Sequence, residues 1–137
     1  MNYQGATKQP TIDQLQPLRN NQDFFNQVVG NPDLKQSFTN SINISNSSYS
    51  ILTETNFYQS VSFRTTSNLI SFNRDIDPES AKTITTPINT NGNFSANLYM
   101  GYGFKVKKMG MYVNLGPSVN YNKSVNSINN QINNSNI

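Results

Sequence analysis

The feature that most constrains the fold is an unbroken two-residue alternation from Asn93 to Val106. Successive side chains of a β-strand point to opposite faces, so this segment predicts one long strand with two different faces. One face would carry Phe94, Ala96, Leu98, Met100, Tyr102, Phe104 and Val106. The other would carry Asn93, Ser95, Asn97, Tyr99, Gly101, Gly103 and Lys105.

A second alternating segment follows the short turn Lys107–Gly110. Its apolar positions are Met111, Val113, Leu115, Val119 and Tyr121, and its polar positions are Tyr112, Asn114, Gly116, Ser118, Asn120 and Asn122. Pro117 falls on the apolar side, where proline indicates a bulge or a local break in the ladder. The sequence therefore predicts an antiparallel hairpin over residues 93–122.

Upstream, the alternation is weaker. Phe38, Ile42 and Ile44 form one apolar row and Phe57, Val61 and Phe63 another. The phase slips near Thr65–Ser67, and a second phase takes in Asn68, Ile70 and Phe72. We expect a loop over residues 10–35, a short connection at 46–56, and a long loop at 73–92 with a short strand possible at 82–86. The low-complexity tail, residues 123–137, could be a loop or a truncated strand.

Composition excludes several classes of function. Apolar residues make up 34% and charged residues 12%, against roughly 45–50% and 25% in ordinary soluble domains. Cysteine and histidine are absent, which removes any cysteine nucleophile or thiolate metal site, the commonest general base and the commonest metal ligand. We expect no enzyme activity, no cofactor and no metal site. The net charge of +3 is scattered apart from Lys105, Lys107 and Lys108, so no nucleic-acid partner is expected.

Strand length and the chemistry of the polar positions favour a bilayer over water. Soluble strands average about 5–6 residues, and their exposed faces usually carry charges that block edge pairing. Here the strands are much longer, their polar side holds Asn, Ser, Gly and Tyr, and short connections alternate with long ones, as in outer-membrane barrels. We predict an all-β, antiparallel meander of long strands that forms a segment of a transmembrane β-barrel.

This interpretation assigns each position of the hairpin to lipid or lumen. The lipid-facing set is Phe94, Ala96, Leu98, Met100, Tyr102, Phe104, Met111, Val113, Leu115, Val119 and Tyr121. The lumen-facing set is Asn97, Tyr99, Gly101, Tyr112 and Asn114. Tyr99, Tyr112 and Arg64 would line a solute path or pack against a plug. Tyr102, Phe104 and Tyr121 fit the aromatic girdles at the two bilayer interfaces.

The N-terminal third resembles a known family. The runs Thr7–Pro17 and Val28–Lys35 are similar to the barrel segment of TonB-dependent receptors, in particular Bacteroidetes-type barrels with an N-terminal carboxypeptidase-regulatory-like domain. In that family a strand ends in a Thr-Arg-x-Pro-type sequence, and a Gly-Asn-Pro-x-Leu-Lys-type stretch leads from a loop into the next strand. The matching positions are Pro10, Gln14, Leu15, Pro17, Gly30, Asn31, Pro32, Leu34 and Lys35. Lys8 replaces the usual Arg, and Gln36-Ser37 replaces Pro-Glu.

The resemblance implies a bacterial outer-membrane receptor of about two dozen strands. Its partners would be outer-membrane lipid, the rest of the barrel, a plug domain, TonB and an unknown ligand. The N-terminus has no secretory signal, so we expect the chain to begin within a longer protein. Two alternatives stay open: a soluble β-rich surface or adhesin module that binds glycans, and a passive outer-membrane barrel without TonB coupling.

Two local features have a structural interpretation and a functional one. Gly30–Lys35 could touch a ligand, but its Gly, Asn and Pro are turn formers, so we interpret it as a loop-to-strand transition. Asp75, Asp77 and Glu79 could bind calcium or act as a hydrolytic carboxylate pair. Pro78 interrupts this cluster, and we interpret it as solvated loop charge.

Overall fold

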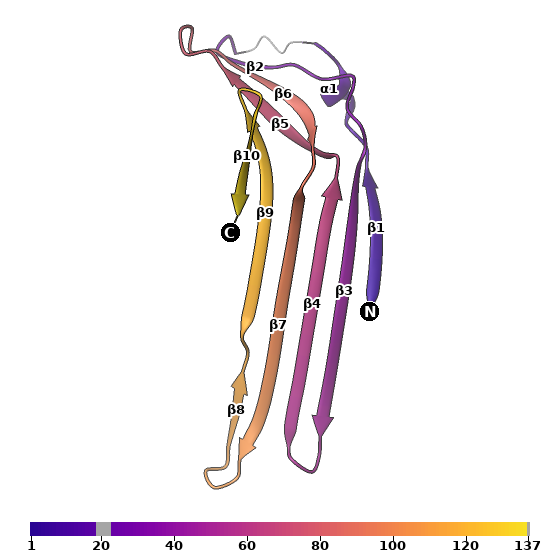
Figure 1. The fold of residues 1–137 in the computed structure, drawn as a ribbon, viewed down its shortest axis with the longest axis vertical. Helices are drawn as coiled ribbons and strands as arrows, with labels where there is room; N and C mark the ends of the chain where they lie inside the picture. Colours follow the sequence, from indigo (N-terminus) through magenta and orange to yellow (C-terminus); the bar gives the residue numbers. More distant parts are fainter. Residues whose placement is uncertain (19–22, 137) are drawn as a thin grey trace.

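The computed structural model describes residues 1–18 and 23–136, and this part of the chain is almost entirely β-structure (Figure 1). One sheet contains all ten described strands. In chain order the elements are β1 (Asn2–Lys8), α1 (Ile12–Leu15), β2 (Asn26–Val28), β3 (Ser37–Ser50), β4 (Thr55–Ser67), β5 (Leu69–Ile76), β6 (Thr83–Thr90), β7 (Asn93–Val106), β8 (Met111–Leu115), β9 (Ser118–Ile128) and β10 (Gln131–Asn136). The predicted all-β class is confirmed.

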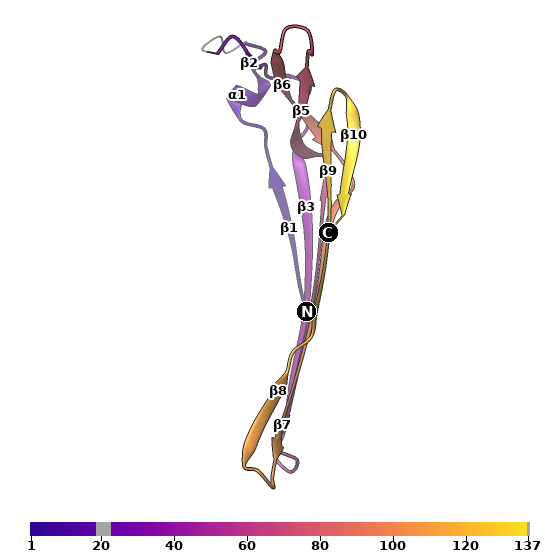
Figure 2. The same ribbon diagram turned by 90° about the vertical axis from the view of Figure 1, so that its left-hand side faces the viewer.

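Most of the sheet is a single-layered wall of long antiparallel strands in the order β1-β3-β4-β7-β9. Figure 2 shows this wall edge-on as one thin layer. β8 pairs with residues 102–106 of β7, and β10 pairs antiparallel with β9. The wall is the predicted meander with two interruptions, because the residues between β1 and β3 and those between β4 and β7 leave it.

The predicted hairpin of residues 93–122 is present, and Pro117 breaks its ladder without a bulge. Tyr102 lies opposite Leu115 and Tyr99 opposite Ser118, so the same number of residues separates the partners on both strands. A bulge would have added one residue to one strand. The Pro117 carbonyl still accepts a hydrogen bond of 3.0 Å from the Met100 amide. β8 and β9 are therefore one continuous path along β7.

The two short turns lie at the same end of the wall (Figure 1). The β3–β4 connection is shorter than expected, because the ladder continues to Ser50↔Thr55 and leaves only residues 51–54 as a turn. The hydroxyl-rich segment Asn46–Ser50 has few apolar residues to mark it as a strand, and the partner strand decides its conformation.

Residues 68–92 form a β-hairpin where a long loop was predicted over 73–92. Asn68 adopts a positive φ of 51° at the end of β4, which accounts for the phase slip in the sequence. β5 and β6 then pair from Leu69↔Thr90 to Ile76↔Thr83. The expected short strand at 82–86 is part of β6, which continues through Pro87. β5 also makes a two-pair parallel contact with β9, and β2 pairs in parallel with β6.

Both ends of the chain also pair. β1 ends at Lys8, as the resemblance implied for the Thr7–Pro10 sequence. The expected loop at 10–35 contains α1 and β2, while residues 19–22 lie outside the described part. The tail is strand rather than loop: Asn129 and Asn130 have φ of 50° and 60°, the geometry of a two-residue type I′ turn, and they join β9 to β10.

The buried side chains gather at the end of the wall opposite the short turns. Leu34, Val125 and Pro87 are buried there, together with polar residues that include Asn73 and Ser127. We call α1, β2, β5 and β6 with their connecting residues the cap. Among the described residues, no helix is long and apolar enough to cross a membrane.

Candidate functional site: the faces of the wall and the cap

The strand register places the predicted apolar set on a single face. Leu98 lies opposite Val61 on β4 and Val119 on β9, and directly opposed residues share a face. Ile44 extends the same row onto β3. The apolar face thus gathers Ile42, Ile44, Val61, Phe63, Phe94, Ala96, Leu98, Met100, Tyr102, Phe104, Met111, Val113, Leu115, Val119 and Tyr121.

Two aromatic clusters lie on the apolar face. Near the cap, the Phe94 ring lies between Phe63 and Tyr121, with ring centroids 6.1 and 5.3 Å apart. Near the short turns, Tyr102 and Phe104 have centroids 5.8 Å apart. Phe94 and Phe104 are separated by about 34 Å along the strand at about 3.4 Å per residue. The residues between the clusters are largely aliphatic.

The opposite face gathers the predicted polar set. Asn97 lies between Ser62 and Asn120, and its side-chain amide donates a 3.0 Å hydrogen bond to the Ser62 hydroxyl. Tyr99, Gly101, Tyr112 and Asn114 share this polar face. The Tyr112 hydroxyl bonds Asn56 at 3.1 Å.

Tyrosine and asparagine side chains cover the glycines of the polar face. A Cβ on Gly116 would approach the Tyr99 hydroxyl to 2.8 Å, and one on Gly101 would approach it to 3.4 Å. A Cβ on Gly103 would overlap the side-chain oxygens of Asn56 and Asn114. The Tyr99 ring also packs on Tyr58 at 5.8 Å. Around these residues lies a hollow of about 350 Å³, which the glycines leave open.

One ion pair joins the two short turns. Lys105 Nζ lies 2.7 Å from a Glu54 carboxylate oxygen, and both side chains are more than a third exposed. The hydrogen bond from Lys105 lowers the pKa of the Glu54 carboxyl below its ordinary value. The cationic cluster expected at Lys105, Lys107 and Lys108 is therefore partly neutralised.

The family-like loop residues hold the cap together. Gly30 is buried against α1, and a Cβ there would overlap the Gln16 backbone carbonyl. Gln14 completes a capping box with Thr11 at the start of α1, and its carbonyl accepts a 2.7 Å bond from the Asn31 amide. Leu34 is buried. These contacts support the structural interpretation of Gly30–Lys35.

The remaining family-like loop residues lie nearer the surface of the cap. Asn31 Nδ2 donates to the Pro87 carbonyl at 3.1 Å, which ties the loop to β6. Pro10 and Leu15 are partly buried, whereas Pro17, Pro32 and Lys35 are exposed. The Lys35 backbone, however, is held on both sides by the Asn89 side chain, at 2.8 and 2.9 Å.

Asn73 is a buried hub that the sequence did not reveal. Its oxygen accepts bonds from the Ser127 hydroxyl at 2.8 Å and the Asn130 amide at 3.2 Å. Its amide nitrogen donates to Asp75 and Asn130 at 3.1 and 2.8 Å. Asn73 thereby fastens β5 to β9 and to the β9–β10 turn. Because asparagine is frequent throughout this chain, its presence at position 73 did not indicate a structural role.

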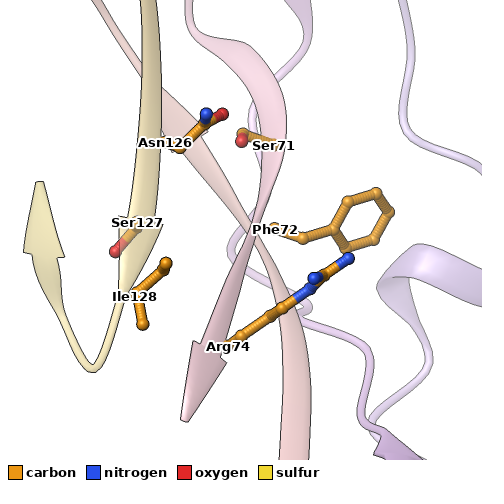
Figure 3. Close-up of a pocket in the computed structure, with 6 residues that line it drawn as sticks. All are labelled: Ser71, Phe72, Arg74, Asn126, Ser127 and Ile128. Carbon is orange, nitrogen blue, oxygen red and sulfur yellow. The ribbon is translucent and has the colours of Figure 1, made fainter. Parts of the chain in front are cut away.

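A hollow of about 290 Å³ opens where β5 meets β9 (Figure 3). Ser71, Phe72, Arg74, Asn126, Ser127 and Ile128 line it. Figure 3 shows Phe72 and Arg74 extending side by side from β5, while Asn126 and Ser71 point toward one another across the gap.

The carboxylates of residues 75–79 serve the cap locally. Asp77 accepts bonds from the Ser80 hydroxyl and the Glu79 amide, and these bonds lower the pKa of its carboxyl. Asp75 accepts from Asn73. Residues 1–18 and 23–136 contain no group of three or more His, Cys, Asp or Glu side chains placed to hold a metal ion.

Comparison with known proteins agrees with this geometry. The family model described as the outer membrane protein beta-barrel family matches residues 1–137. Comparison with curated proteins and with solved structures gave no match. A single-layered wall of long strands, apolar on one face and polar on the other, is what such barrels are built from. The chain therefore belongs to the outer membrane protein beta-barrel family, whose members lie in the bacterial outer membrane.

Proposed function

We propose that this chain forms wall and outer loops of a TonB-dependent uptake receptor, with its apolar face against lipid and its polar face lining the interior. The observation that carries the proposal is the pair of aromatic clusters around Phe94 and Phe104. At a strand tilt of about 40°, their separation projects to about 26 Å along the membrane normal, close to the apolar band of about 25 Å in such barrels.

The two ends of the wall support one orientation. Outer-membrane barrels have short periplasmic turns and longer extracellular loops. The turns at 51–54 and 107–110 lie at one end, and the cap at the other. The cap would then face the outside, where a receptor captures its ligand. TonB coupling follows from the resemblance of residues 7–17 and 28–35 to that receptor family.

Residues 1–137 contain no cysteine, so single cysteines introduced into them test the orientation once any cysteine elsewhere in the gene product has been replaced. We would replace Glu79 in the cap or Met109 in the short turn with cysteine, one at a time, in the protein made from its own gene. A membrane-impermeant maleimide should label Glu79→Cys on intact cells and Met109→Cys only after the outer membrane is opened. The reverse labelling order would overturn the orientation, and labelling of both sites on a soluble protein would overturn the membrane assignment.

Uptake needs a separate measurement. Cells with and without the gene would receive labelled iron chelates, cobalamin, oligosaccharides or peptides, with and without a protonophore. The proposal expects accumulation of one class that requires both the gene and an energised membrane. Gene-dependent entry that ignores the protonophore would identify a passive barrel instead.

A further inference from the structure

Charge is distributed unevenly over the polar face. The seven acidic residues lie in α1, in the connections or in β5: Asp13, Asp23, Asp33, Glu54, Asp75, Asp77 and Glu79. Hence, along β1, β3, β4, β7, β8 and β9, the polar face has no carboxylate. It carries three cations, Lys8, Arg64 and Lys105. Since Glu54 neutralises Lys105 and Lys8 ends the edge strand β1, Arg64 is the remaining cation, on β4 near the cap-side end of its ladder with β7.

Arg64 is held by one contact and surrounded by small polar groups. Its Nε donates a 3.2 Å hydrogen bond to the Ser41 hydroxyl on β3, which fixes the plane of the guanidinium. On one side lies a hollow of about 180 Å³, lined also by Ser41, Asn43, Ser62, Ser95 and Asn97. On the other lies a hollow of about 210 Å³, lined by the polar residues Thr66, Asn93, Asn122 and Ser124 and also by Phe94 and Lys123.

We infer that Arg64 is a binding site for the carboxylate or phosphate group of a small polar ligand on its way through the barrel. This inference rests on the proposed function, because it requires the polar face to line the interior. A guanidinium matches two oxygens of a carboxylate or phosphate through parallel hydrogen bonds. The surrounding hydroxyl and amide groups can bond the uncharged polar part of the same ligand, and the side chains are small enough to leave space for it.

The position of Arg64 favours a ligand over a plug carboxylate as the occupant. Arg64 lies opposite Ser95, next to Phe94 of the cap-side aromatic cluster. It is therefore near the outer mouth in the proposed orientation, where an entering solute meets the wall. No carboxylate on the polar face of the wall repels an anion that approaches Arg64.

The test is binding of defined probes to the detergent-folded protein made from its own gene. Citrate supplies carboxylates, glucose 6-phosphate supplies a phosphate, and glucose is the uncharged reference. Calorimetry should show binding of at least one anionic probe, weaker binding of glucose, and a loss of about tenfold or more with Arg64→Gln. Lys108→Gln is the control: it removes the same charge in the short turn between β7 and β8, at the opposite end of the wall from Arg64, and should leave the affinity unchanged.

A second measurement does not depend on how the variant folds. Phenylglyoxal modifies exposed arginines, and peptide mass spectrometry separates Arg64 from Arg74. The effective anionic probe should slow modification of Arg64 and leave Arg74 unchanged. Equal affinity in wild type and Arg64→Gln, or no protection of Arg64, overturns the inference. A variant that binds the probe normally but melts at lower temperature assigns Arg64 to an internal contact instead. Neither binding nor protection requires uptake, so a failure of TonB-dependent transport would overturn the proposed function without deciding whether Arg64 binds anions.

Discussion

At the scale of single residues, Leu98 and Asn97 are neighbours in sequence but point to opposite faces of β7. Leu98 lies midway between the aromatic clusters, opposite Val61 and Val119. An arginine facing lipid at mid-bilayer costs about 2–4 kcal/mol. We expect Leu98→Arg to lower the free energy of unfolding by that amount, measured by urea titration in lipid vesicles, and Asn97→Arg to leave it nearly unchanged.

Depth supplies an internal control for this prediction. Val113 lies opposite Phe104 in the cluster near the short turns, so Val113→Arg should cost only about 0–1 kcal/mol, as at the interfaces. Equal costs at Leu98, Val113 and Asn97 would contradict the assignment of faces and of depth together.

Replacing Gly30 should destabilise the cap. Gly30→Ala places a methyl group against the Gln16 carbonyl, and overpacking of this kind costs about 1–3 kcal/mol. We expect faster proteolysis within residues 9–36 and an unchanged wall. In Gly5→Ala the new Cβ meets the tips of two side chains, the Phe38 ring at 2.9 Å and the Tyr3 hydroxyl at 3.3 Å, and both can move, so this variant should be cut like the wild type.

Some of these residues were predictable and others were not, for a physical reason. Period-two alternation reports which side of a strand a residue takes, and Leu98 and Asn97 fall as predicted onto opposite faces. Gly30 and Leu34 were singled out by resemblance. Asn73 and Asn89 were missed, because a hydrogen-bonding role depends on which backbone groups the fold brings near, and a chain rich in asparagine does not indicate that.

At the scale of elements, Asn73 fastens β5 to β9. Asn73→Ala removes four hydrogen bonds and leaves the Asn130 amide and Ser127 hydroxyl without that partner. An unsatisfied buried group costs about 1–3 kcal/mol. We expect faster amide hydrogen exchange across β5 and β6, with β3, β4 and β7 unaffected.

A suitable control for that experiment is Asn126→Ala. Asn126 is exposed on β9, so its replacement should not change exchange in the cap. Uniform acceleration along the whole wall in Asn73→Ala would show that the cap and the wall unfold as one unit.

The Glu54–Lys105 pair links the β3–β4 and β7–β8 turns in a pH-dependent way. Folding lowers the pKa of Glu54, so the contact stabilises the fold above the ordinary carboxyl value of about 4.3 and is lost as pH falls through the lower folded value. In an NMR titration, Lys105→Gln should raise the Glu54 midpoint toward that ordinary value. The Asp77 midpoint depends mainly on Ser80 and should not move. An unchanged Glu54 midpoint would show that Lys105 does not stabilise the Glu54 carboxylate.

Predictability also varied among elements. β7, β8 and β9 each carry alternating apolar residues, and their pairing followed from the sequence. β6 was largely predicted as loop because Pro87 is normally excluded from central strands. Here its β5 partner is Phe72, while the ladder with β2 ends at Thr85. β10 has little apolar content, and the Asn129–Asn130 turn and the adjacent β9 ladder determine its conformation.

At the scale of the whole molecule, the wall has little interior of its own. Outside the cap, both faces are largely half-exposed or exposed, including Val61, Met100 and Val119. Without lipid on the apolar face, little apolar burial offsets chain entropy. We expect residues 1–137 to be unfolded or aggregated in buffer and to gain β-signal by circular dichroism in detergent. A monodisperse, cooperatively melting protein in plain buffer would favour the soluble glycan-binding alternative.

The β5–β6 excursion begins and ends at nearly one point, because the Asn68 amide bonds the Asn91 side chain at 2.7 Å. The register of β4 against β7 is consequently indifferent to the length and sequence of what lies between them. Changes in this segment therefore leave the β4–β7 register intact as long as the contacts of Asn73 with Ser127 and Asn130 are kept. In the proposed orientation this segment faces the cell's surroundings, so its sequence can diversify toward new nutrients, phages or antibodies while the strands that insert into the membrane stay the same.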